Sequence, residues 1–138
     1  SQLEVYFNSC FALLAPGGRF LNHAVARVPA FGRGASLGRF CDRYVFPDAE
    51  VHEVGVVVSA VQRAGFEALH MEVFGEHYAR TLRSWVANLE ASWGAAIGEI
   101  GERRARIWRL YMAAVALAFE GGRVQVAQVL AARRRRDG

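Results

Sequence analysis

Four stretches of the chain place hydrophobic residues three or four positions apart, which is the spacing of one face of an α-helix. The predicted helices span residues 2–14, 50–64, 77–100 and 102–119. In the third helix the expected buried stripe consists of Tyr78, Leu82, Trp85, Val86, Leu89, Trp93, Ile97 and Ile100. In the fourth it consists of Ile107, Leu110, Tyr111, Ala114, Leu117 and Ala118. The last two helices follow each other directly and are expected to form a hairpin.

Turn-forming residues mark the ends of these helices. A Pro-Gly-Gly run at 16–18 stops the first helix and turns the chain. Asp48 is the predicted N-cap of the second helix, and Gly65 is its C′ residue. Gly101 separates the two long helices, and the glycines at 121–122 end the second of them.

Three further stretches are predicted to be β-strands. Residues 19–26 are mostly apolar, which predicts a strand buried on both faces. Residues 66–74 and 123–131 alternate apolar and polar side chains, as half-buried strands do, and the last strand is expected to be antiparallel. The Gly- and Arg-rich stretch 27–44 is predicted to be irregular. Because sheets usually have about 4–6 strands, part of the sheet is expected to lie outside this chain.

Composition narrows the class of protein. A chain of 138 residues with 53% hydrophobic residues is expected to fold as one globular domain, and disordered or repetitive classes are excluded. All 17 basic residues are arginine, and four of them form the run Arg133–Arg136. Without this run, which is expected to be solvated, basic and acidic residues balance. No predicted strand interleaves basic and aromatic residues, so a nucleic-acid partner is not expected.

Cysteine, histidine and hydropathy patterns argue against several other classes. Cys10 and Cys41 lack the spacing of a zinc site, and no histidine pair shares a helix face, so no metal is expected. Residues 1–14 lack the basic start of a secretory signal. The longest nearly uncharged stretch, Leu110–Phe119, has about half the length of a membrane span. A cytoplasmic protein with reduced thiols is the expectation.

Three sequence segments together resemble one family. The first is LLAPGGRFLNHAV at Leu13–Val25. The second is VFPDAE at Val45–Glu50, followed by AGFE at Ala64–Glu67. The third is EHYARTLRSWVANLEASW at Glu76–Trp93, with the later RLYMAAVALAFEGGRVQVAQVL. Over residues 3–132 the chain resembles the C-terminal half of the cyclopropane-fatty-acyl-phospholipid synthases, which include the mycolic acid cyclopropane synthases.

The resemblance implies an α/β fold: the C-terminal portion of a class I S-adenosylmethionine (SAM) methyltransferase, Rossmann-like, with a helical hairpin inserted before the last strand. Residues 1–138 would form the C-terminal part of that domain, and the hairpin would act as a lid over the acyl site. SAM would bind mainly to an N-terminal half that this chain does not contain. No Gly-rich turn follows a predicted strand here, and Gly32 and Gly34 lie in the irregular stretch. We therefore expect no SAM-binding residues within the chain and no turnover by the chain alone.

The resemblance also implies a bicarbonate site. In the family a double bond attacks the methyl group of SAM, and a bound bicarbonate then takes a proton so that a ring closes. The ion is held by a Cys, a Glu, a His, a backbone amide and a Tyr. The last three correspond to His23, the amide of Val25, and Tyr78, which makes His23 and Tyr78 the implied catalytic residues. The Cys and the Glu would lie before Ser1. Without the resemblance, His23 would be interpreted as a core histidine and Tyr78 as a packing residue.

Aromatic residues are the remaining candidates for the site. Phe46, Trp85 and Tyr111 are candidate walls, because aromatic faces stabilise a nearby cation. The tryptophans at 85, 93 and 108 are expected in the core, with lining of an acyl channel as the alternative. His52, His70 and His77 are expected on the surface.

The implied function is transfer of a methyl or methylene carbon from SAM to the double bond of an unsaturated phospholipid or other acyl chain. Peripheral contact with a membrane through Arg133–Arg136 and association into homo-oligomers through an exposed sheet edge are further expectations. Three alternatives stay open at this point. They are acyl methylation without ring closure, methylation of a small amine, and a non-catalytic interaction module.

Overall fold

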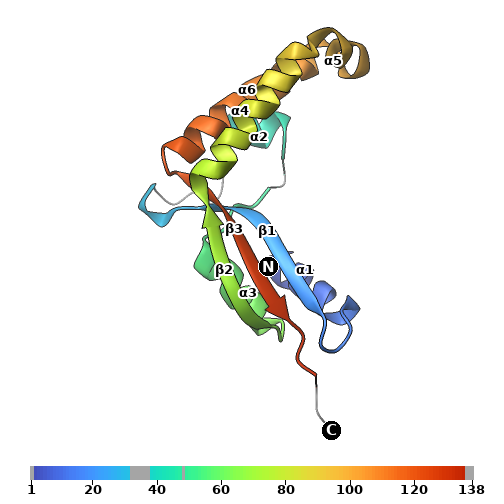
Figure 1. Cartoon of the computed structure of the whole chain (residues 1–138), viewed down its shortest axis with the longest axis vertical. Coiled ribbons are helices and arrows are strands. Elements are labelled where there is room, and N and C mark those ends of the chain that lie inside the picture. The colour runs from blue at the N-terminus through green and yellow to red at the C-terminus, as the bar shows by residue number, and fades with distance from the viewer. Residues whose placement is uncertain (1, 32–37, 48, 136–138) are drawn as a thin grey trace. The chain divides into compact units, whose positions relative to one another are not determined.

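The computed structural model describes residues 2–31, 38–47 and 49–135 (Figure 1). The predictions made for Gly32, Gly34, Asp48 and Arg136 lie outside the described residues. The chain divides into two compact units. Unit 1 comprises residues 1–26, 52–73 and 126–138, and unit 2 comprises residues 27–51 and 74–125.

A three-stranded antiparallel sheet is the framework of unit 1, and it confirms the three predicted strands. The strands are β1 (Arg19–Arg27), β2 (Glu67–Phe74) and β3 (Val124–Ala132), in the spatial order β1-β3-β2. Figure 1 shows β3 running opposite to both of its neighbours. At one end the Arg133 amide donates to the Gly18 carbonyl, and at the other the Val28 amide donates to the Arg123 carbonyl. The register between β1 and β3 is therefore constant along the whole strand.

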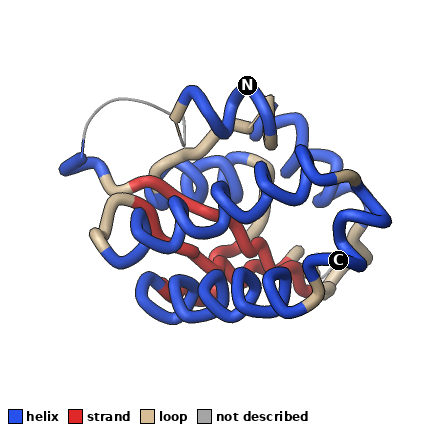
Figure 2. The backbone as a smooth tube through the Cα atoms, turned by 90° about the horizontal axis from the view of Figure 1, so that it is seen from above, coloured by secondary structure: helices blue, strands red, loops and turns tan. Residues whose placement is uncertain are grey.

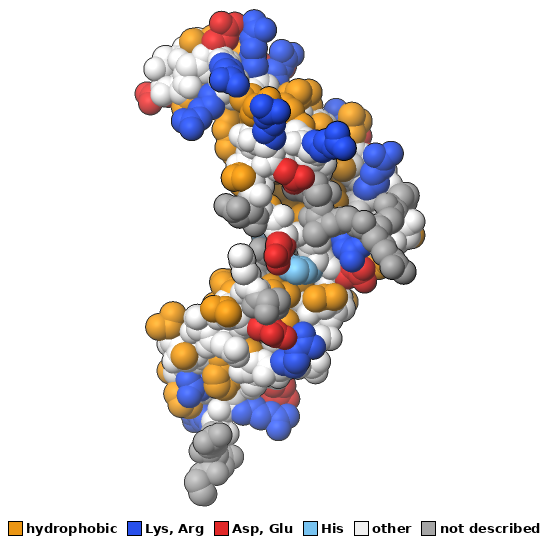
Figure 3. Space-filling view, turned by 180° about the vertical axis from the view of Figure 1, so that it is seen from behind, with side chains coloured by type: hydrophobic (Ala, Val, Ile, Leu, Met, Phe, Trp, Pro, Cys, Tyr) orange, Lys and Arg blue, Asp and Glu red, His pale blue; other side chains and the backbone are white. Residues whose placement is uncertain are grey.

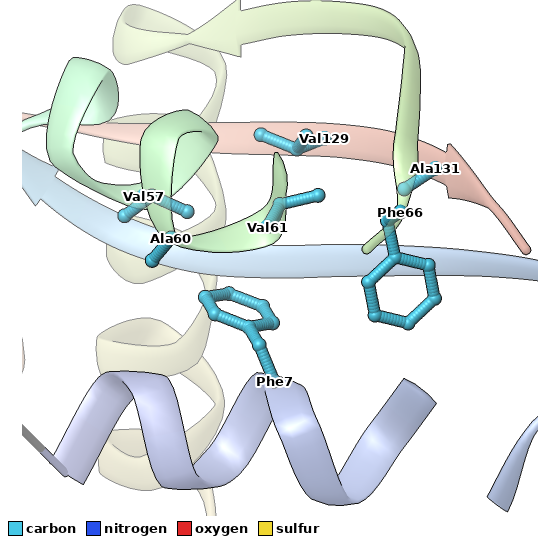
Figure 4. Close-up of a cluster of buried hydrophobic side chains, with 7 residues drawn as sticks. All are labelled: Phe7, Val57, Ala60, Val61, Phe66, Val129 and Ala131. Atoms are coloured by element: carbon cyan, nitrogen blue, oxygen red, sulfur yellow. The ribbon is translucent and has the colours of Figure 1, made fainter. Parts of the chain in front are cut away.

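The core of unit 1 lies on one face of this sheet. Helices α1 (Gln2–Leu13) and α3 (Val54–Arg63) pack against each other. Their apolar side chains meet those of the sheet in a buried cluster (Figure 4). The cluster consists of Phe7, Val57, Ala60, Val61, Phe66, Val129 and Ala131. Edge-to-face and stacked ring pairs, such as Phe7 with Phe20 and Phe20 with Phe66, add to the apolar burial.

The ends of α3 confirm one prediction and correct another. The helix begins at Val54 rather than at residue 50, because Glu53 has extended φ and ψ angles of −69° and 148° and acts as the N-cap. Gly65 has a φ of 98°, as expected of a C′ glycine. Its amide donates to the Gln62 carbonyl, and the Phe66 amide donates to the Val61 carbonyl. These two bonds form a Schellman motif, which ends the helix and turns the chain into β2.

The expected burial of the outer strands is wrong. On β1, Asn22 and Ala26 are buried, but Leu21 on the opposite face is 52% exposed. On β2 only the start is covered, and Leu69 and Met71 are exposed. The physical reason is that both are edge strands and that the core cluster covers one face of the sheet only.

The first arginine of the C-terminal run is not simply solvated. The Arg133 guanidinium donates to the carbonyls of Phe11 and Leu14 at 2.9 and 2.7 Å, and lies 4.6 Å from the centroid of the Phe11 ring. It therefore satisfies carbonyl groups at the end of α1 that lack partners within the helix. Arg134 forms a bidentate pair with Glu67.

Unit 2 is mostly helical, and Figure 2 draws the helices of the whole chain in blue. The described residues of this unit form a short 3-10 turn, η1 (Pro29–Phe31), and four α-helices. These are α2 (Arg39–Tyr44), α4 (Gly75–Ala91), α5 (Trp93–Ile100) and α6 (Glu102–Glu120). Helices α4 and α6 pack together, and a bidentate pair between Arg83 and Glu120 joins them. The expected hairpin is thus confirmed, whereas α2 was not predicted.

The predicted helix 77–100 is interrupted. Ser92 has φ and ψ angles of −109° and 27°, which end α4 and begin α5. Serine and the nearby Gly94 and Gly98 have low helix propensity, so a continuous helix is weak at this point. Gly101, with a φ of 78°, separates α5 from α6 as expected.

Helix α6 buries a different face from the predicted one. The buried residues are Ala105, Met112, Val115, Ala116 and Phe119. Leu110 and Leu117 of the predicted stripe are 55% and 62% exposed. The second half of α6 is apolar all round, so periodicity alone does not select the buried face. The small side chains of Ala105 and Ala116 are fully buried.

Candidate functional site

His23 lies on the more exposed face of β1, directly opposite Gln128 of β3. Its Nδ1 is 3.0 Å from Nε2 of Gln128. An amide nitrogen can only donate a hydrogen bond, so in this arrangement Nδ1 is the acceptor and the ring proton is on Nε2. In that tautomer Nε2 carries the N–H, a type of donor that binds oxyanions.

The amide of Val25 adds a second donor on the same strand. In the β1–β3 ladder, Gly18 and Val28 are the residues whose backbone groups bond to β3. Along a strand, the N–H and C=O groups of successive residues point alternately toward and away from the neighbouring strand. His23 and Val25 are an odd number of positions from Gly18 and Val28, so their amides point away from β3, to the outer edge of β1. The side chains of these two residues also share one face of the sheet, as predicted from their spacing. An imidazole donor and a main-chain donor are thus placed at one edge of unit 1.

Tyr78 lies in the first turn of α4, in unit 2, and is half-buried. Its ring centroid is 5.1 Å from that of Phe119 and 6.0 Å from that of Trp85. The ring of Trp85 crosses it edge-on, at 78°. The Tyr78 ring therefore packs against two aromatic neighbours.

A second aromatic group in unit 2 joins two of the candidate wall residues. The rings of Phe46, Trp108 and Tyr111 contact one another at centroid distances of 5.6 to 6.1 Å. Burial, followed by the nearby Cys41 thiol and Tyr78 phenol, raises the pKa of Tyr111. Tyr111 therefore keeps its O–H proton at neutral pH and can donate a hydrogen bond.

Two of the tryptophans are more exposed than expected. Trp85 and Trp108 are 45% and 37% exposed, so neither is a core residue. Trp93 is half-buried, and the Arg109 guanidinium lies 6.0 Å from its ring. Of the histidines, His70 and His77 are exposed as predicted, whereas His52 is half-buried in the segment before α3.

The structure unites part of the predicted site. His23 and Val25 share one face of β1 in unit 1, and Tyr78 belongs to unit 2. The meeting of all three around one anion therefore stays a prediction. Sequence reasoning missed Gln128, whose contact with His23 depends on a strand pairing across 105 positions. The alternation of β3 together with its pairing to β1 is the signal that could have found it.

Comparison with known proteins decides the family. Residues 1–129 match the family model described as mycolic acid cyclopropane synthetase. The chain belongs to the mycolic acid cyclopropane synthetase family. It is 44% identical over 127 residues to a probable fatty acid methyltransferase of Mycobacterium tuberculosis, covering 91% of this chain and 29% of that protein. It is 36% identical over 140 residues to a probable fatty acid methyltransferase of Pseudomonas putida, covering 100% of this chain and 36% of that protein.

A solved member of the mycolic acid cyclopropane synthetase family has the same fold. The crystal structure of a mycolic acid cyclopropane synthase complexed with SAH and CTAB matches with a TM-score of 0.82 at 23% identity. The match covers 95% of this chain and 50% of that chain. The chain thus has part of the class I methyltransferase fold, as predicted, and it spans half or less of the length of these three proteins.

Among the described residues, none of β1, β2 and β3 is followed directly by a Gly-rich turn at a helix N-terminus, which is a common cradle of cofactors such as SAM. The described part of the chain also holds no group of three His, Cys, Asp or Glu residues that could bind a metal ion. In the same residues, no helix is both long and apolar enough to cross a membrane.

The donors on β1 are of a type that binds small oxyanions. The Nε2–H of His23 and the amide of Val25 are neutral donors on one strand edge, and the Tyr78 phenol is a third donor in unit 2. An anion in an apolar surrounding needs several such donors to offset its lost hydration. The two donors on β1 are of the kind that a small oxyanion such as bicarbonate requires.

Proposed function

We propose that this chain is the C-terminal half of an enzyme that transfers a methyl or methylene carbon from SAM to a double bond of an unsaturated lipid acyl chain. The observation that carries the proposal is the pair of donors on β1, His23 Nε2–H and the Val25 amide, in a chain 44% identical to a probable fatty acid methyltransferase. The names of the two relatives, which are called probable fatty acid methyltransferases, support an acyl-chain substrate. The chain's own contribution would be the anion site and the aromatic walls.

His23, Val25 and Tyr78 would hold bicarbonate by three hydrogen bonds from different directions. Bicarbonate would supply the base that accepts the proton lost by the alkylated acyl chain. Gln128 keeps the proton of His23 on Nε2, so the imidazole donates to the anion and does not compete with it as a base. Phe46 and Tyr111 would face the positive charge that develops on the acyl chain, which aromatic faces stabilise by up to ~2 kcal/mol when dry.

A chimera tests this proposal. The chain would be fused after the residues that precede the matched region in the Mycobacterium tuberculosis relative, and incubated with SAM and unsaturated phosphatidylethanolamine. Mass spectrometry of the released fatty acids should show acyl chains carrying one additional carbon. The 138-residue chain alone should bind no SAM in calorimetry and form no product.

The variants His23→Ala and Tyr78→Phe sharpen the test. Each removes one donor to the anion, and loss of such a donor typically lowers kcat by about 10²–10³-fold. Removal of bicarbonate from the buffer should lower the rate of the unaltered chimera and have less effect on the variants. A folded chimera that binds SAM but modifies no acyl chain would refute the proposed function.

Formation of a methyl branch in place of a ring is the second candidate. The two relatives described above are called fatty acid methyltransferases, which favours simple methylation as much as ring closure. The same donors would serve both reactions, since each begins with a carbon transferred to a double bond. Proton NMR of the product separates them, because cyclopropane methylene protons resonate apart from those of other acyl groups.

A further inference from the structure

The face of α6 that points to solvent is unusually apolar. Leu110 and Leu117 are 55% and 62% exposed, and Ile107 is only half-buried. Leu110 and Leu117 are seven residues apart, and Arg103 precedes Leu110 by the same interval. Seven residues make nearly two helical turns, so these three side chains lie in one line along the helix. A surface helix normally places polar residues there.

Arginine side chains lie around the exposed leucines of α6. Three shallow clefts of about 510, 310 and 300 Å³ run along α2, the α5–α6 turn and the first half of α6. Their charged lining residues are Arg43, Arg103, Arg104, Arg106, Arg109 and Glu102. Figure 3 shows basic side chains interleaved with hydrophobic ones over the part of the molecule that contains α4–α6. The surface thus combines a strong positive charge with exposed hydrocarbon.

Much of this charge is available to a partner. Arg106 pairs with Glu102, and Arg109 pairs with Glu90. Within the described part of the chain, Arg103 and Arg104 take part in no ion pair. Tyr44, which is 43% exposed, adds an amphipathic ring at the border of two of the clefts.

We propose that the arginine–leucine surface, defined as Arg43, Tyr44, Arg103, Arg106, Leu110 and Leu117, docks on a bilayer that contains anionic phospholipid. Arginine side chains bind lipid phosphate, and the leucines enter the boundary between head groups and acyl chains. Tyrosine is also enriched at this depth of a bilayer. The interaction is peripheral and needs no spanning helix. It extends the proposed function but does not depend on it.

Two other occupants fit the surface less well. A second copy of the chain would set arginines against arginines across a two-fold axis, which is repulsive. An acidic protein would satisfy the arginines. It would not require exposed hydrocarbon at Leu117, which lies about one turn beyond Ala113, the last residue that lines the basic clefts. A bilayer surface satisfies both parts of the pattern.

Vesicle flotation tests the proposal on the 138-residue chain without SAM, so the result is separate from the test of methyl transfer. The chain should bind phosphatidylglycerol–phosphatidylcholine vesicles, bind pure phosphatidylcholine at least tenfold more weakly, and lose affinity as salt is raised. The double variant Arg103→Glu/Arg106→Glu should bind at least tenfold more weakly, since each basic residue near an anionic surface contributes about fivefold. Leu110→Ser/Leu117→Ser should also reduce binding, even at low salt.

Matched variants and a soluble polyanion complete the experiment. Arg19→Glu/Arg63→Glu changes the net charge equally in unit 1 and should bind within about twofold of the unaltered chain. Equal loss in this control would overturn the proposal, because net charge alone would then explain binding. The proposal would also be overturned if both surface variants bound vesicles as well as the unaltered chain does. If the arginine variant then lost binding to polyglutamate, the partner would be an acidic protein. Circular dichroism and sedimentation confirm that each variant is folded and in the same oligomeric state.

Discussion

The contact between Gln128 and His23 predicts which ring nitrogen of His23 carries the proton, and this can be tested directly. Replacing Gln128 with leucine keeps the shape of the side chain but removes the donor to Nδ1. In the unaltered chain, nitrogen NMR of neutral His23 should show the proton on Nε2. In Gln128→Leu, a mixture of the two tautomers is expected, together with about tenfold lower activity of the chimera.

Gln125→Leu is the matched control for this prediction. Gln125 lies on the same strand, an odd number of positions away, so its side chain points to the other face of the sheet. It should leave the His23 tautomer unchanged. If Gln128→Leu also leaves the ring proton on Nε2, the assigned role of Gln128 is wrong.

The pair between Arg83 and Glu120 predicts a pH dependence of stability. Hydrogen bonds from Arg83 hold the pKa of Glu120 below its ordinary value of 4.5. A carboxylate whose pKa is lowered by folding stabilises the protein above the unfolded pKa and loses that contribution as pH falls through the folded pKa. The unaltered chain should therefore lose stability below about pH 4.5, partly through this pair.

Urea unfolding at a series of pH values measures the effect. Arg83→Gln should be less stable near neutral pH and should lose less stability between about pH 5 and pH 3. Arg80→Gln, on the exposed side of the same helix, should follow the unaltered chain. A parallel decline of Arg83→Gln and the unaltered chain would show that the pair has no part in the acid response.

The sequence allowed part of the candidate site to be predicted at the level of single residues. His23, Val25 and Tyr78 stand in motifs that resemble a family, and their spacing placed the first two on one strand face. Gln128 has no motif, and its importance arises only when β3 pairs with β1 in one register. The group formed by Phe46, Trp108 and Tyr111 likewise depends on packing between distant segments.

At the scale of elements, two glycines associated with α3 have opposite roles. Gly65 has a φ of 98°, and a Cβ at this position would lie 3.2 Å from the Phe11 ring. Gly65→Ala should therefore lower the free energy of unfolding by about 1–2 kcal/mol. Gly55 lies in the first turn of the helix, where a Cβ would meet nothing within 4 Å. Gly55→Ala should raise the free energy of unfolding by up to ~1 kcal/mol.

Equilibrium unfolding in urea measures both changes on the same helix. Because the two substitutions are chemically identical, their difference isolates backbone conformation and local space from side-chain chemistry. Equal effects of Gly65→Ala and Gly55→Ala would contradict the Schellman ending of α3.

The ends of helices were predicted well where a glycine with a positive φ angle sets the boundary. Gly65, Gly101 and Gly122 all have positive φ and end elements as expected. Signals that depend on tertiary contact were less informative. The buried face of α6 could not be chosen from a segment that is apolar all round, and α2 was missed in a Gly- and Arg-rich stretch. The break at Ser92 also falls within a continuous hydrophobic pattern.

At the scale of the whole chain, two cores stabilise different parts of the sequence. In unit 1, Phe7 is fully buried between α1, α3 and the sheet. In unit 2, Leu82 of α4 is 1% exposed, in a helix that packs on α6. The strands β1 and β3 reach from one unit into the other, so the backbone couples them. Stability need not be uniform in such a chain, since compact units can open separately.

Native-state hydrogen exchange with two small core changes tests this division. Phe7→Leu and Leu82→Val should each cost about 1 kcal/mol. If the units open separately, Phe7→Leu should speed exchange mainly in α1 and α3, and Leu82→Val mainly in α4 and α6. Each change should then leave the slowest amides of the other unit within about twofold of their original rate. A uniform increase in exchange across α3 and α6 for both variants would mean instead that the two cores form one cooperative unit, joined through the continuous strands β1 and β3.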